Sequence, residues 1–168
     1  PESLEAACRQ HDARAYYAVP TMHNPTCATI PAERRREIAR IALKQDLLIV
    51  EDDIYRFLDP SAPDPLVALA PENVIFLSSA SKQLAPGLRI GGLIAPERLM
   101  GRIENVIRTS TWMPAPPMAE VLSCWIEDGT AARLEEGKRQ VLGARQSILN
   151  QMLGEHAITS HPHGMHAW

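Results

Sequence analysis

The sequence has few cysteines, few aromatic residues and no excess of basic charge. It contains 3 cysteines among 168 residues, and 5% of the residues are aromatic. The cysteines lie far apart without CxxC spacing, which argues against a disulfide framework or a zinc site and favours a reducing, cytoplasmic compartment. Lys and Arg number 17 against 20 Asp and Glu, giving a net charge of −3. The chain therefore offers no basic surface for nucleic acid.

Long hydrophobic runs are also missing. The longest apolar runs, such as Leu47–Val50, are far shorter than the roughly 20 residues of a membrane-spanning helix. No signal peptide precedes them, so we expect no membrane partner. The sequence starts at Pro1 and stops at Trp168 in what reads as the opening of a strand. We therefore expect the chain to be part of a longer protein.

The first half of the chain alternates short apolar runs with amphipathic segments. Within the last of these runs, Gly91 and Gly92 permit close approach of another backbone. A strand, helix, strand, strand order with buried strands predicts an α/β fold with a mostly parallel sheet covered by helices. The runs typical of buried strands are residues 15–19, 47–50, 74–77 and 88–95.

A helix is predicted between the first two strands. Pro31 suits its first turn, and Ile38, Ile41 and Ala42 form one apolar stripe. The charged run 33–36, which contains three consecutive arginines, is interpreted as the solvated face of this helix rather than as a nucleic-acid site. Further helices are predicted at residues 96–109, 118–128 and 131–156. The last is long enough to lead from the α/β layer into a second domain.

Four polar stretches follow the predicted strands, at the positions where open α/β sheets bind ligands: residues 23–26, 51–55, 78–82 and 86–91. Lys82 follows three serines, and a lysine partly desolvated there can attack an aldehyde. Taken alone, it can equally be a solvated loop lysine. Ser79, Ser81 and Arg89 can bind a phosphate, although such serines also cap turns and such arginines also lie free on surfaces.

Three more side chains extend this pattern. Asp52 ends a buried strand, where its carboxylate can hold a heteroaromatic nitrogen protonated or can simply cap the next turn. Tyr55 and Asn24 can each donate a hydrogen bond to a ligand oxygen. Taken singly, each of these signals is weak.

Taken together, these stretches resemble a family. The order Asn24-Pro25-Thr26, Asp52-x-x-Tyr55, Ser79-x-Ser81-Lys82 and Ala85–Gly91 is similar to the fold-type I pyridoxal-phosphate (PLP) enzymes of the class I/II aminotransferase group, over approximately residues 15–165. The resemblance implies a PLP-dependent transferase-like fold. It places residues 1–128 in the C-terminal part of the PLP-binding large domain, and 129–168 in a long helix and the start of a small α+β domain.

The resemblance also implies residue roles. Lys82 looks like the lysine that forms the internal aldimine with PLP and later shuttles the α-proton. Asp52 resembles the partner of the pyridine nitrogen, and Tyr55 and Asn24 resemble the pair that binds the ring's 3-oxygen. Ser79, Ser81 and Arg89 are similar to the phosphate-binding residues of the family.

Residues 51–55, 81–89 and 129–132 are most similar to the aminotransferase-like half of MocR-type regulators, a branch of the GntR transcription factors. This resemblance implies an effector-sensing, dimerising domain that binds an amino acid or another amine and contacts DNA only through a missing N-terminal domain. The same motifs occur in free-standing aminotransferases such as the aminoadipate group. The motifs therefore leave a transcription regulator and a transaminase open.

Two features depart from this pattern or lie outside it. Cys27 stands where the family usually has glycine, and a turn with positive φ there costs a non-glycine residue about 1 kcal/mol or more. We interpret its thiol as a buried bystander. The histidines near the end, His156, His161, His163 and His166, have spacings found in metal sites. Without neighbouring cysteine or acidic ligands we interpret them as structural and expect no metal.

Overall fold

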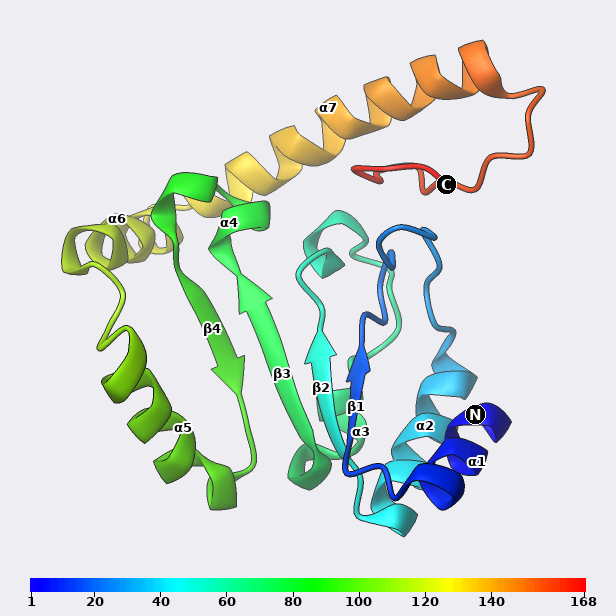
Figure 1. Cartoon of the computed structure of the whole chain (residues 1–168). Coiled ribbons are helices and arrows are strands. Elements are labelled where there is room, and N and C mark those ends of the chain that lie inside the picture. Colours follow the sequence, from blue (N-terminus) through cyan, green and yellow to red (C-terminus); the bar gives the residue numbers. More distant parts are fainter.

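The apolar runs form a four-stranded sheet in the computed structural model, which describes all 168 residues (Figure 1). The strands are β1 (Ala15–Ala18), β2 (Leu48–Asp52), β3 (Val74–Ser79) and β4 (Gly91–Ile94), and they lie side by side in chain order. The first three are parallel, and β4 is antiparallel to β3. The prediction of an α/β fold with a mostly parallel sheet is confirmed.

Helices lie on both sides of this sheet and across one of its ends (Figure 1). They are α1 (Glu2–His11), α2 (Ala32–Gln45), α3 (Leu66–Leu69), α4 (Ala80–Gln83), α5 (Glu97–Ser110), α6 (Pro116–Glu127) and α7 (Thr130–Leu153). Three short 3₁₀ turns join them: η1 (Arg56–Leu58), η2 (Pro71–Asn73) and η3 (Pro86–Leu88). None of the helices combines the length and the hydropathy needed to cross a membrane.

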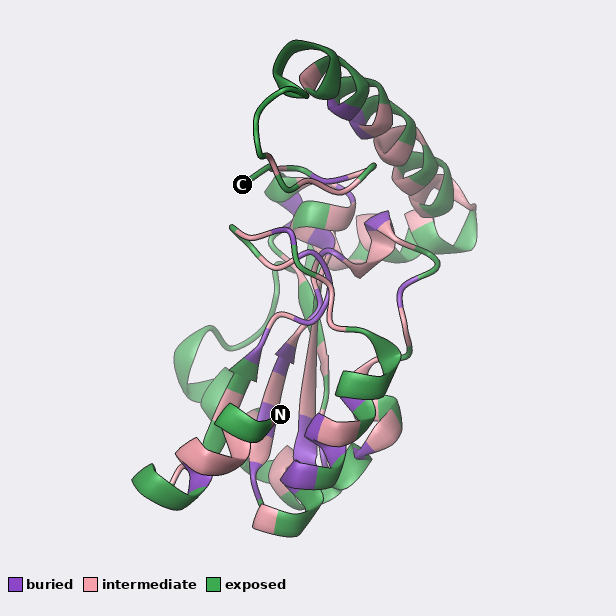
Figure 2. Cartoon of the chain, turned by 90° about the vertical axis from the view of Figure 1, so that its right-hand side faces the viewer, coloured by how far each residue is buried: buried purple, intermediate pink, exposed green.

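The main core lies on one face of the sheet. Alternate strand residues such as Ala18, Ile49 and Val74 pack there against the apolar stripe of α2, which includes the predicted Ile38 and Ala42. Residues of α1 and α3 complete this cluster. Figure 2 shows buried segments where the strands meet these helices.

The opposite face is covered less completely. Only α5 lies along it, no residue of α5 is buried, and a cavity of about 460 Å³ separates this helix from Leu48, Ile75 and Leu93. The run 47–50 was expected to be covered on both faces. In the structure Leu48 and Val50 are only half-buried, because a single helix lies over this side.

The strand predicted at residues 88–95 is shorter than expected. Residues 86–88 form η3, and Arg89 takes a left-handed conformation with φ 52°, so the strand begins at Gly91. A Cβ on Gly91 would lie 3.1 Å from the Ser78 carbonyl oxygen, which confirms the expected close approach there. At Gly92 nothing lies within 4 Å of such an atom.

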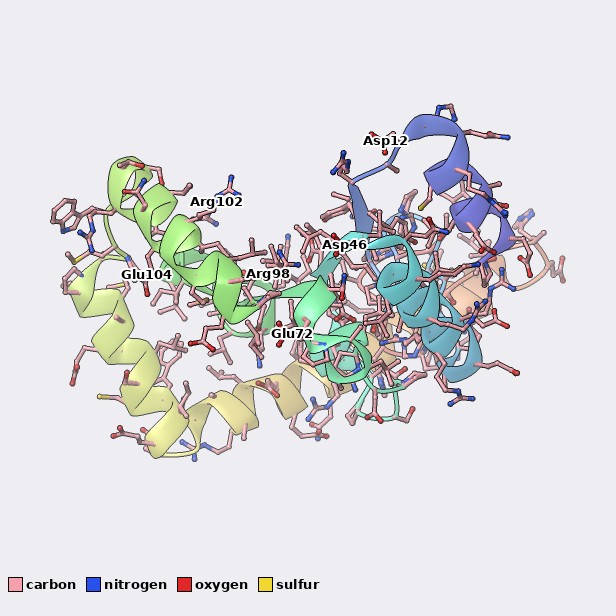
Figure 3. The ribbon with its side chains drawn as sticks, turned by 90° about the horizontal axis from the view of Figure 1, so that it is seen from below. Asp12, Asp46, Glu72, Arg98, Arg102 and Glu104 are labelled. Atoms are coloured by element: carbon pink, nitrogen blue, oxygen red, sulfur yellow. The ribbon has the colours of Figure 1, made fainter.

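The other end of the sheet carries a separate set of charged residues (Figure 3). Asp12 and Asp46 end α1 and α2 in left-handed conformations, with φ 46° and 49°. The Arg98 guanidinium donates to the Glu72 carbonyl oxygen at 3.0 Å, which ties α5 to η2. These residues lie away from the polar stretches at the carboxyl ends of the strands.

The charged run 33–36 is not entirely solvated, and for Arg35 the prediction is wrong. Its neighbours Arg34 and Arg36 are exposed, but Arg35 is fully buried. Its guanidinium donates five hydrogen bonds of 2.9–3.2 Å to the carbonyl oxygens of Pro20, Ile30, Pro63 and Asp64 and to the Thr21 hydroxyl. Loop acceptors far apart in sequence thus satisfy a charge that helical periodicity assigns to solvent.

Cys27 adopts φ 59°, so the tight turn is kept although a non-glycine residue occupies it. The side chain is buried, as expected. Because glycine tolerates positive φ better than alanine does, we predict that Cys27→Gly is about 1 kcal/mol more stable than Cys27→Ala. Urea unfolding of the two variants measures this difference.

Cys8, which is also buried but lies within α1, provides the matched control. In a helix interior the order reverses, and Cys8→Gly is expected to be about 1 kcal/mol less stable than Cys8→Ala. The same order at both positions would contradict the conformational explanation.

Candidate functional site

The acidic residues that end β2 point to opposite faces of the sheet, because side chains alternate along a strand. Glu51 is buried on the core face, where its two carboxylate oxygens accept from the backbone N–H groups of Leu66 (2.7 Å) and Val67 (2.9 Å). Burial raises the pKa of Glu51, while these two hydrogen bonds oppose the shift. Glu51 therefore caps α3 and is structural.

Asp52 lies on the less covered face beside Tyr17 of β1. Its Oδ2 accepts a hydrogen bond from the Tyr17 phenol, and this bond is the largest cause that raises the pKa of Tyr17 to about 12. Its Oδ1 is buried and has no hydrogen-bond partner. A buried acceptor without a donor costs about 1–3 kcal/mol. The position therefore suits a ligand that donates a hydrogen bond.

A cavity of about 450 Å³ adjoins this carboxylate. Asp52 and Ser79 both line it, together with Leu77 and Gly91 from the neighbouring strands and Ile107 from α5. The strand registers explain this grouping, since Asp52 pairs with Leu77 and Ser79 pairs with Gly91. Of the residues predicted from sequence, the structure thus brings Asp52 and Ser79 into one cavity.

Ser81 and Lys82 lie in α4, immediately after β3. The Ser79 hydroxyl oxygen accepts from the Ser81 N–H at 3.2 Å, so Ser79 caps this turn as well as lining the cavity. Lys82 is exposed, and so is Arg89 beyond η3. Neither side chain lines the cavity beside Asp52.

Asn24 and Tyr55 come after β1 and β2. Asn24 is exposed on the loop after β1. Tyr55 is buried in a cluster with Met22, Leu58 and Leu142, and the charge of its phenol adds a small upward effect to the pKa of Tyr17. All seven predicted residues thus lie beyond the same end of the sheet, but only two of them line one cavity.

Sequence reasoning did not identify Tyr17 as part of this site. It read Tyr17 only as a residue of a buried strand, although 60% of its surface is exposed. The parallel register, which pairs Tyr17 with Val50, places its phenol within reach of Asp52 two residues later. Strand pairing is the one signal that identifies this contact, and it is not visible along a single strand.

The terminal histidines make contacts within the chain. His161 Nε2 lies 3.5 Å from an Asp59 carboxylate oxygen, and a ring nitrogen of His163 lies 3.3 Å from the Leu58 carbonyl oxygen. Burial lowers the pKa of His161. The His166 ring packs edge-on against Tyr55 with centroids 5.7 Å apart, so it holds the tail beside the cluster that contains Tyr55.

Known proteins match this chain over nearly its whole length. The sequence model of the family described as aminotransferase class I and II matches residues 2–168. The chain is 30% identical to the uncharacterized HTH-type transcriptional regulator YdeF of Bacillus subtilis over 168 residues, which cover 100% of this chain and 36% of that protein. It is 33% identical to the aminotransferase swnA of Metarhizium robertsii over 194 residues, covering 100% of this chain and 39% of swnA.

Among solved structures, kynurenine aminotransferase of Pyrococcus horikoshii in complex with PMP superposes with a TM-score of 0.88 at 25% identity. The match covers 97% of this chain and 43% of that one. The chain thus spans well under half the length of the proteins it matches.

Proposed function

Because the chain belongs to the class I and II aminotransferase family, whose cofactor is pyridoxal phosphate, we propose that it is the cofactor-binding, effector-sensing part of a MocR-type transcription regulator of the GntR group. The observation that carries the proposal is the buried Oδ1 of Asp52, which lacks a donor beside a cavity at the end of the sheet. A protonated ring nitrogen supplies such a donor.

The other residues at this end fit the same cofactor. The hydroxyls of Ser79 and Ser81 and the guanidinium of Arg89 would hold its phosphate. Asn24 and Tyr55 would bind the ring oxygen. When bound, PLP supplies an aldehyde that condenses with amines and a ring that withdraws electrons.

The chain's own residues have distinct tasks in this proposal. Asp52 keeps the ring nitrogen protonated, and Tyr17 holds the Asp52 carboxylate in place through its phenol. Lys82 supplies the amine that anchors the cofactor and, once displaced, accepts or returns a proton at its Nζ. Leu77 and Ile107 exclude water from the cavity beside Asp52.

The effector in this proposal is an amino acid or another amine, which would exchange with Lys82. We further propose a homodimer in the cytoplasm, DNA contact through a separate N-terminal domain, and a boundary near residue 128 before a small domain. YdeF, which matches the whole chain, supports the regulator. The absence of disulfides between the free Cys8, Cys27 and Cys124 supports the compartment.

A free-standing aminotransferase is the second candidate, and the equally complete match to swnA favours it. In that case the same residues would serve amino-group transfer between an amino acid and a 2-oxo acid. The two candidates use the same lysine and the same aspartate. They differ only in the event that cofactor exchange triggers, which is a change in DNA binding for the regulator and release of a new amino acid for the enzyme.

The deciding experiment loads the full-length protein with PLP and adds a panel of amino acids and 2-oxo acids. For a regulator we expect an amine to change the cofactor's absorption and the affinity for promoter DNA without sustained formation of a new amino acid. Sustained amino-group transfer without DNA binding would establish the enzyme instead. A protein that takes up no PLP would exclude both candidates.

Replacing Asp52 by asparagine should weaken PLP binding by about ten- to a hundredfold, because a charge-assisted hydrogen bond to the ring becomes a neutral one. Titration of the cofactor-free protein with PLP measures this loss. Asp12→Asn is the control, since Asp12 lies at the other end of the sheet in a left-handed conformation that asparagine tolerates (Figure 3). Equal affinities of the two variants would contradict the role of Asp52.

A further inference from the structure

Helix α7 crosses the end of the sheet where the polar stretches lie (Figure 1). The ammonium group of Lys138, near the middle of this helix, donates to the backbone carbonyl oxygens of Lys82, Gln83 and Leu84 at 2.7, 3.2 and 3.2 Å. These carbonyls form the C-terminal end of α4, where helical acceptors have no partner within the helix. A single side chain from α7 therefore closes the turn that carries Lys82.

The surroundings of Lys138 make this contact strong. The ammonium is partly buried and lies 5.8 Å from the centroid of the Phe57 ring. Burial lowers the pKa of Lys138, so its charge is partly removed from water and interacts more strongly with the carbonyl dipoles. A positive charge at the C-terminal end of a helical turn is also stabilised by the aligned peptide dipoles.

Neighbouring residues of α7 hold the same two segments. Glu135, one turn earlier, accepts a hydrogen bond from the Gln83 side chain. The Arg139 guanidinium donates to the Phe57 carbonyl oxygen at 2.7 Å, which fixes η1 directly after Tyr55. Helix α7 thus ties the turn that carries Lys82 to the turn after Tyr55.

We propose that Lys138 is a positioning residue, which acts from α7 to fix the backbone of Lys82 and thereby the point from which the Lys82 amine reaches the cofactor. The side chain of Lys82 is long, flexible and exposed, so its backbone is the part that the fold can hold. This inference rests on the proposed function of Lys82.

The first test requires no cofactor. The N–H groups of Leu84 and Ala85 donate to the Ala80 carbonyl oxygen at 2.8 and 3.1 Å, so their hydrogen exchange reports opening of α4. In the cofactor-free, full-length protein we expect Lys138→Met to accelerate their exchange by about tenfold or more. Arg145→Met removes the same charge from an exposed position of α7 and should leave this exchange unchanged.

The second test measures how fast PLP becomes bound to Lys82, with borohydride reducing the link to a stable amine. We expect the rate to fall about tenfold in Lys138→Met, and Lys138→Arg, which keeps the charge and the donors, to restore most of it. Melting temperatures identify any variant that is simply unfolded.

The outcomes separate the two proposals. If the wild-type protein binds no PLP at Lys82, the proposed function fails, and with it the positioning role. If the wild-type protein binds PLP and Lys138→Met binds it at the same rate, the positioning role alone is wrong, whatever happens to amide exchange.

Discussion

The Lys82→Ala variant of the full-length protein is expected to retain no borohydride-trapped PLP, whereas the wild-type protein carries the label on one peptide. The chain contains three lysines, Lys44, Lys82 and Lys138. Lys44 forms an ion pair with Glu5 at 2.9 Å on α1, and Lys138 donates to three backbone carbonyls. Lys82 is therefore the lysine of this chain whose amine is available at the carboxyl end of the sheet.

Mass spectrometry of digested, reduced protein locates the label. The matched control is Lys44→Ala, which removes a lysine far from the candidate site and should be labelled as well as the wild type. Labelling of Lys82→Ala at the wild-type level would assign the attachment to another residue. The expected effect is a complete loss because no neighbouring amine of this chain can replace Lys82 without breaking its own contacts.

The sheet was predictable because strand burial leaves a direct record in the sequence. The runs 15–19, 47–50 and 74–77 are apolar over lengths that suit strands, and all three form parallel strands. The positions of Asp52 and Ser79 could be inferred from the strand ends. What the runs do not contain is how much of each face is covered, so the half-buried side of β2 was overestimated.

The contacts that sequence reasoning missed all join segments far apart in the chain. Tyr17 reaches Asp52 across 35 residues, and Lys138 reaches the Lys82 carbonyl across 56. In α7, the apolar residues Leu134 and Val141 suggested a packing stripe, but both are exposed. Which helix face packs depends on the partner surface, and helical periodicity alone does not specify it.

Arg35→Met is expected to destabilise the protein by on the order of 3–5 kcal/mol, the range for breaking a buried charged network. Methionine fills similar space but leaves the acceptors of five hydrogen bonds buried without a donor. Burial lowers the pKa of Arg35, and the nearby Asp53 carboxylate opposes the shift. The buried guanidinium is thus retained as a cation by its acceptors and this neighbouring acid.

Urea unfolding of Arg35→Met against Arg34→Met measures this effect, because Arg34 is the adjacent, exposed arginine and its replacement should cost no more than about 0.5 kcal/mol. A difference below about 1 kcal/mol between the two variants would contradict the role assigned to Arg35. The consequence reaches the candidate site, because Arg35 joins the loop that carries Asn24 to the segment after Tyr55. A variant that still folds should therefore bind PLP more weakly, since the loops that flank the cofactor lose their common anchor.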